Sequence, residues 1–144
     1  MKELRMGTML CCVVSLLAMG VVVAGSAAPV IAADETRLKT RLTGPDIGGL
    51  VPSGAAEFRK RGINKRFTTE VEDVNLTGSL RVCVNGMDLG TISLASGFGD
   101  LNLDTRDGQT VPGMSSGNVV TVRSGGTDCS TGTAILIGEL ASVL

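Results

Sequence analysis

The sequence predicts an all-β protein, an antiparallel β-sandwich of about seven or eight short strands that follows an N-terminal signal peptide. Three observations predict this fold. Short segments alternate polar and apolar residues, as strands with one buried face do. Gly, Pro, Asn and Asp separate these segments at intervals of about ten residues, which is typical of antiparallel sheets. Residues 34–144 contain no heptads and no long apolar run at helical spacing, and their number suits one domain.

Residues 1–33 have the three parts of a secretory signal peptide. Lys2 and Arg5 give a positive start, and Met9–Val23 is almost entirely apolar. Residues 24–33 are mostly small and apolar, and a polar sequence follows them. This layout predicts export, so we expect a secreted or periplasmic location.

We expect cleavage after Ala33, with Ala32 and Ser26 as alternative positions. An uncleaved anchor is the other hypothesis, because residues 9–33 carry no charge and are long enough to span a bilayer. The shortness of the strongly apolar part favours cleavage. Residues 34–144 then form the β-domain, and the membrane would be a partner only if cleavage failed.

The first expected strand is residues 36–43, where Leu38 and Leu42 face one side and three cations face the other. Residues 44–54 contain two prolines and four glycines and are therefore expected to be a loop.

Residues 56–59 and 67–72 form the best-defined hairpin, because both segments alternate. Placing Phe58 opposite Phe67 leaves residues 61–64 as the connection. Two facing arginines near this connection should then repel each other, so we expect the tip to be splayed or exposed.

Residues 80–84 alternate, and the Asn-Gly pair at 85–86 is a strong hairpin signal. A strict two-residue turn would place the next apolar side chains on the wrong face. A three-residue loop or a bulge at Gly90 restores the alternation and brings Leu80 opposite Ile92.

The remaining strands are expected at residues 91–95, 100–105, around 120–122 and at 134–140. Ile135, Leu136 and Ile137 do not alternate, which predicts a strand covered on both faces.

Two of the four cysteines, Cys11 and Cys12, lie in the predicted signal peptide. Cys83 and Cys129 remain, and an exported chain meets an oxidising compartment. We expect a disulfide between them, which would add about 2–4 kcal/mol to stability. The alternative is two unpaired thiols.

Several segments carry a resemblance to a known kind of module. They are Gly54-x-Ala56-x-Phe58-Arg59, Arg66-Phe67-x-x-Glu70-Val71-Glu72-x-Val74, Leu80-x-Val82-x-Val84-x-Gly86 and Gly90-Thr91-Ile92. Together they resemble small exported β-modules of environmental bacteria, which have no established activity. The order LTG…VP…GxAxF is also similar to the start of chordin-type (CHRD) β-domains, whose later histidines this chain lacks. The resemblance covers residues 42–140 and implies a fold and a location.

The composition excludes several kinds of chemistry. The chain has no His, which removes Ser-His-Asp and Cys-His sites and imidazole metal ligation. It has no Trp or Tyr to stack on sugars. Residues 34–144 hold two more acidic than basic residues, which argues against a nucleic-acid partner. Of the three aromatic residues, Phe58 and Phe67 are expected in the core, and an exposed contact residue is the alternative hypothesis for Phe98, which lies in a glycine-flanked tip.

Paired carboxylates leave one enzymatic hypothesis open, because two acids suffice for glycoside hydrolysis. Glu70 and Glu72 share one strand face. A small flat domain has no cleft for a sugar chain, so we expect a solvated acidic face, no catalytic residues and no cofactor.

The segment GDLNLDTRDG, residues 99–108, resembles a calcium loop at first sight. With Asp100 as position 1, Thr105 falls where glycine belongs and Val111 where glutamate belongs. A looser surface cation site formed by Asp104, Asp107 and a backbone carbonyl is the alternative. A strand explains the segment better, with two leucines inward and an acidic stripe outward, and we expect no metal site.

Five cations lie within eight residues of the predicted hairpin: Arg59, Lys60, Arg61, Lys65 and Arg66. They are the candidate ligand-binding residues, for an anionic glycan, a lipid head group or an acidic protein face, including that of another copy. The alternative is that their charge keeps the hairpin soluble and prevents edge pairing. The sequence therefore predicts a non-enzymatic exported module with a structural or interaction role, and, as the alternative, a binder of anionic ligands through residues 59–66.

Overall fold

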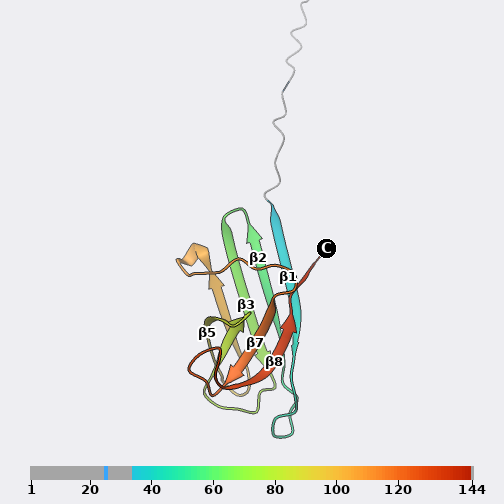
Figure 1. The fold of residues 1–144 in the computed structure, drawn as a ribbon, viewed down its shortest axis with the longest axis vertical. Coiled ribbons are helices and arrows are strands. Elements are labelled where there is room, and N and C mark those ends of the chain that lie inside the picture. The colour runs from blue at the N-terminus through green and yellow to red at the C-terminus, as the bar shows by residue number, and fades with distance from the viewer. Residues whose placement is uncertain (1–24, 26–33, 144) are drawn as a thin grey trace, which may run out of the picture. The chain divides into compact units, whose positions relative to one another are not determined.

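The computed structural model describes residue 25 and residues 34–143. The predicted signal peptide lies outside the described residues, apart from Gly25. The strands are β1 (Glu35–Thr43), β2 (Ser53–Arg61), β3 (Asn64–Glu72), β4 (Ser79–Val84), β5 (Met87–Ser93), β6 (Gly99–Asp104), β7 (Val119–Ser124), β8 (Thr133–Glu139) and β9 (Ala141–Ser142). One short 3₁₀ helix, η1 (Thr105–Asp107), follows β6 (Figure 1). No helix in this described part of the chain is long and apolar enough to cross a membrane.

The strands form one antiparallel sheet that is nearly closed into a barrel. Their order is β5–β4–β7–β8–β1–β2–β3–β6, and β9 adds to β1. The all-β antiparallel prediction is confirmed, but the prediction of a sandwich is wrong. A sandwich needs two separate sheets, whereas here β8 pairs with β1 at Ile137 and Thr43 and joins the two halves. The two edge strands, β5 and β6, are consecutive in the chain and approach each other, with Leu101 against Gly90.

Glycine permits the close approach of backbones where β1 meets β8. A Cβ on Gly138 would lie 2.6 Å from the carbonyl oxygen of Arg41. A Cβ on Gly44 would lie 1.7 Å from the carbonyl oxygen of Ile135, a distance that no side chain tolerates. The absence of side chains at these two positions therefore allows the sheet to close.

The inward faces of the strands fill the barrel with a single apolar core. Its largest fully buried side chains are Phe58, Phe67, Leu38, Leu42, Leu80, Ile92, Leu136 and Leu140. Burial of each such side chain contributes about 1.5–3 kcal/mol. Phe58 and Phe67 face each other across β2 and β3, as predicted.

The β2–β3 hairpin has the predicted register but a tighter tip. Pairing continues to Arg61 and Asn64, so the turn contains only Gly62 and Ile63, with Gly62 at φ 58°. The tip is exposed but not splayed: Ile63 is 90% exposed, and Arg59 remains paired with Arg66.

The β4–β5 hairpin combines a two-residue Asn-Gly turn with a bulge. Val84 pairs with Met87, and the register shifts between Val82 and Cys83. Gly90, at φ 138°, then pairs with Val82. The bulge brings Leu80 opposite Ile92, as predicted, because the extra residue restores the inward set.

Strand β8 is not covered on both faces, so the prediction made for it is wrong. Ile135 and Leu136 are buried, but Ile137 is 53% exposed. The pairing of β7 with β8 shifts register at Val122, which pairs with Leu136, while Arg123 pairs with Ala134. Two consecutive buried residues therefore come from a bulge, not from a second covering layer.

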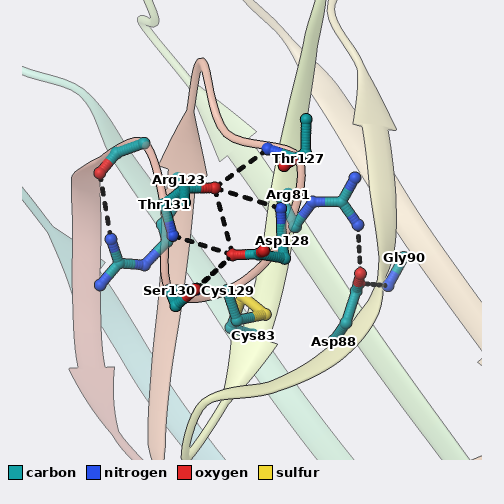
Figure 2. Close-up of a disulfide and its surroundings, with 11 residues drawn as sticks. Arg81, Cys83, Asp88, Gly90, Arg123, Thr127, Asp128, Cys129, Ser130 and Thr131 are labelled. Atoms are coloured by element: carbon teal, nitrogen blue, oxygen red, sulfur yellow. Dashed lines mark hydrogen bonds and ion pairs between the residues drawn. A yellow bond between two sulfur atoms is a disulfide. The ribbon is translucent and has the colours of Figure 1, made fainter.

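A disulfide joins Cys83 on β4 to Cys129 in the loop between β7 and β8, as predicted (Figure 2). Cys83 faces away from the core, yet it is only 1% exposed. The carboxylate of Asp128 accepts hydrogen bonds from both the backbone and the hydroxyl groups of Ser130 and Thr131, which holds the loop in a turn. These bonds lower the pKa of Asp128, with the hydroxyl of Ser130 as the largest cause.

Candidate functional site

The five predicted ligand-binding cations do not share one surface. Side chains alternate along a strand, and the buried Phe58 and Phe67 fix which face is inward. By this alternation Arg59, Arg61 and Arg66 lie on the outer face of the sheet. Lys60 and Lys65 are Cα partners on its other face, at the end of the barrel.

Lys65 has a structural contact on that side. Its ammonium group donates to the carbonyl of Val111 at 3.1 Å, and its backbone N–H donates to the hydroxyl of Thr105 at 3.0 Å. Lys65 therefore fastens η1 and the following loop to the hairpin. Of the predicted set, the three arginines are the ones brought together on the outer face.

The outer face carries a row of arginines across three strands. Arg37 on β1 pairs with Arg59 on β2, and Arg59 pairs with Arg66 on β3. Like charges placed directly opposite each other destabilise a sheet. The cost at Arg59 is offset by Glu35, whose carboxylate accepts from the guanidinium group at 2.6 Å.

Asp104, at the end of β6, completes this row as the Cα partner of Arg66. Arg106 in η1 donates to both of its carboxylate oxygens, from Nε at 3.0 and 3.1 Å and from Nη2 at 2.5 Å. The backbone N–H of Arg106 adds a further bond of 2.9 Å. The side chain and then the backbone of Arg106 lower the pKa of Asp104 to about 2, and the pKa of Arg106 is raised in return.

Asp104 therefore differs from the predicted acidic outer stripe. It has the outward position of a strand residue, but it is only 6% exposed, because η1 and Arg106 fold over it. Asp100 and Asn102 are exposed as predicted. The carboxylate of Asp104 is held by Arg106, and Arg66, which forms no ion pair within residues 34–143, adds a smaller charge interaction that also lowers the pKa of Asp104.

Residues at this end of β2, β3 and β6 and in η1 line a depression of about 200 Å³. Its lining is Arg59, Arg61, Asn64, Lys65, Arg66, Asp104 and Arg106. The ion pairs of residues 34–143 include Arg59 and Arg106 but neither Arg61 nor Arg66. Arg66 donates only from Nε, to the side-chain oxygen of Asn102 at 3.1 Å. We call Arg59, Arg61, Arg66 and Arg106 the basic surface.

Sequence reasoning missed Arg106. It lies far from the hairpin in the chain, and it joins the basic surface only because β6 pairs with β3 and η1 follows β6. Two strands, β4 and β5, lie between β3 and β6 in the chain, and no pattern of residues in the sequence predicts that β3 pairs with β6. The position of Lys60 and Lys65 on the other face could have been predicted from the sequence, because the predicted register of the hairpin already places them there.

A second feature of the outer face lies nearer the other end of the same strands. Glu70 and Glu72 on β3 and Asp100 on β6 are exposed, and we call them the acidic surface. They line a depression of about 720 Å³, and Phe98, 51% exposed, stands beside them. Phe98 is therefore exposed in its glycine-flanked tip.

The segment GDLNLDTRDG begins with a strand, as predicted, and continues into η1, with Leu103 buried. In the described part of the chain, His, Cys, Asp and Glu side chains nowhere gather in a group of three or more that could hold a metal ion.

Guanidinium groups present several donors in one plane, so this arrangement suits the oxygens of phosphate, sulfate or carboxylate groups. Comparison of the chain with models of known protein families and with curated proteins found no match.

Proposed function

We propose that this chain is an exported, non-catalytic interaction module that binds anionic groups through the basic surface. One observation carries the proposal: four arginines from β2, β3 and η1 surround one depression, and its only carboxylate is already neutralised by Arg106. The ligand class is an oxyanion, namely a phosphate, sulfate or carboxylate carried by a lipid head group, a glycan or a protein.

The charge distribution supports this proposal over a merely solvated hairpin. Cations that serve only solubility gain most when they are spread apart or interleaved with acids. Here Arg59 and Arg66 are direct cross-strand partners, and Arg61 adds a third guanidinium beside them. An anion bound between them would replace their mutual repulsion with charge-assisted hydrogen bonds. Export is supported by the pattern of residues 1–33 and, more weakly, by the disulfide.

The test compares three anionic probes that differ in their source of oxygens. Heparin supplies sulfate groups, phosphatidylglycerol vesicles supply phosphate groups, and poly-glutamate supplies carboxylates. We expect the wild-type chain to bind at least one of them, with an affinity that falls as salt rises. The variant with Arg61→Ala and Arg66→Ala together should bind that probe at least about tenfold more weakly.

Arg41→Ala is the matched control, because Arg41 is an exposed arginine on the outer face of β1, away from the basic surface. It should bind like the wild-type chain. Equal binding by the double variant, or an equal loss in the control, would overturn the proposal.

A further inference from the structure

The outer face of β2, β3 and β6 segregates its charges into two groups of opposite sign, whereas β1 beside it carries a cation in both rows, Arg37 in that of Arg59 and Arg41 in that of Glu70. Arg59 and Arg66 are cross-strand partners at one end. Glu70 and Asp100 are cross-strand partners nearer the other. Both pairs set like charges opposite each other, which costs stability within one chain. The ion pairs of residues 34–143 include none of Arg66, Glu70 and Asp100.

The spacing of the two groups follows from strand geometry. Arg66 and Glu70 lie on β3 with the same outward orientation, and four residues of a strand span about 13 Å. The row between them consists of Glu57, Thr68 and Asn102, which are neighbours across β2, β3 and β6. Glu57 is already neutralised by Arg37 and Lys39, at 2.8 and 3.0 Å. The middle row therefore separates the charged groups without favouring either sign.

A half-turn about an axis along this middle row exchanges the two ends of the face. It places Arg66 of one copy over Glu70 of the other, and Glu70 of the first over Arg66 of the second. Along β6, the same rotation brings Arg106, beside Asp104, over Asp100. Each contact forms twice, because both surfaces belong to one face of one sheet.

We propose that a second copy of this chain covers the outer face of β3 and β6 in a two-fold dimer, with Arg66 and Arg106 of each copy on Glu70 and Asp100 of the other. Charge complementarity along β3 selects a second copy as the occupant, since this strand carries both Arg66 and Glu70 on its outer face. The depression of about 720 Å³ gives the incoming arginine side chains room. Phe98 beside it offers an aromatic ring to a guanidinium group.

The experiment uses charge exchange and sedimentation velocity at low salt over a range of protein concentrations. The wild-type chain should form dimers that dissociate as salt rises. Arg66→Glu and Glu70→Arg should each be monomeric, because each places like charges in both contacts. An equimolar mixture of the two variants should form a mixed dimer, because both contacts are then between opposite charges. The chain that carries both substitutions should dimerise like the wild-type chain.

Lys60→Glu is the matched control, because it reverses one charge in the same hairpin but on the other face of the sheet. It should dimerise like the wild-type chain. A wild-type chain that stays monomeric at every concentration, a single variant that still dimerises, or a mixture that stays monomeric would overturn the proposal.

The experiments can overturn either proposal without overturning the other. Glu70 is not part of the basic surface, so Glu70→Arg should lose the dimer and still bind the anionic probe. Loss of probe binding in the variant with Arg61→Ala and Arg66→Ala together does not by itself test whether the mixture of Arg66→Glu and Glu70→Arg forms a dimer.

Discussion

Arg106 holds the carboxylate of Asp104, two residues earlier in the chain, through both carboxylate oxygens and a backbone N–H. This pair ends β6 and begins η1, and it takes up the hydrogen bonds of the carboxylate that lies opposite Arg66. The same contact serves the fold, by fixing the end of a strand, and the basic surface, by adding a fourth guanidinium group to it. It also makes the stability of the protein depend on pH.

Asp104→Asn should weaken this pH dependence. The pKa of Asp104 is about 2 in the folded protein and about 3.9 in an unfolded chain. The folded state therefore binds fewer protons between these values, and its advantage is complete above about pH 4 and lost as pH falls towards 2. Urea unfolding at pH 5 and at pH 2.5 should show a smaller loss of stability in the variant than in the wild-type chain. The variant should still lose some stability, because the pKa of Asp128 is also lowered. Equal losses would show that Asp104 does not contribute.

Replacement of both bonded cysteines, as Cys83→Ala with Cys129→Ser, should lower the free energy of unfolding by about 3–4 kcal/mol. The bridge spans 46 residues, and closing a loop of that size restricts the unfolded chain by about this amount. Urea unfolding with and without reductant measures it. Reductant should shift the midpoint of the wild-type chain and leave that of the double variant in place. A wild-type midpoint that ignores reductant after full reduction would contradict the prediction.

Thr69→Val should leave the protein as stable as before or more stable by up to about 1 kcal/mol. Thr69 is 1% exposed, and its hydroxyl group has no hydrogen-bond partner among the described residues. A buried hydroxyl without a partner costs free energy that a methyl group of similar shape does not. Thr68→Val, on the outer face of the same strand, is the control and should change little. A loss well above 1 kcal/mol at Thr69 would mean that its hydroxyl group is bonded.

Gly44→Ala should destabilise the protein by at least about 2 kcal/mol, because its Cβ would overlap the carbonyl oxygen of Ile135. Gly113→Ala is the matched control, since a Cβ there meets nothing within 4 Å and its φ is not positive. The control should stay within about 0.5 kcal/mol of the wild-type chain. Thermal unfolding of the two variants measures the difference, and equal stabilities would contradict the close approach of β1 and β8.

The strands could be predicted from the sequence because alternation is a local signal. Phe58 and Phe67 fix the register of their hairpin, and the Asn-Gly turn with Gly90 fixes that of the next. The closure of the sheet could not be predicted, because it depends on the pairing of Thr43 with Ile137 and on the backbone contact at Gly44. These residues are far apart in the chain, and each is unremarkable in its own segment.

The candidate site likewise contains residues whose position the sequence predicts and a residue whose position it does not predict. Arg59, Arg61 and Arg66 could be predicted as neighbours, because they belong to one hairpin. Arg106 could not, since only the pairing of β3 with β6 brings it there. The segregation of charge over the outer face of β2, β3 and β6 likewise became visible only when the pairing of these strands was known.

The position of β1 in the middle of the sheet has a consequence for the time course of folding. Its neighbours are β2, which follows it directly, and β8 and β9, where Leu38 pairs with Ser142. A chain that has emerged only as far as β7 can therefore pair β1 with β2 but lacks the partners on the other side of β1. Pairings between such distant segments are slow to form, typically in milliseconds to seconds for all-β domains. The barrel is thus completed late, when nearly the whole of residues 34–143 is present at once.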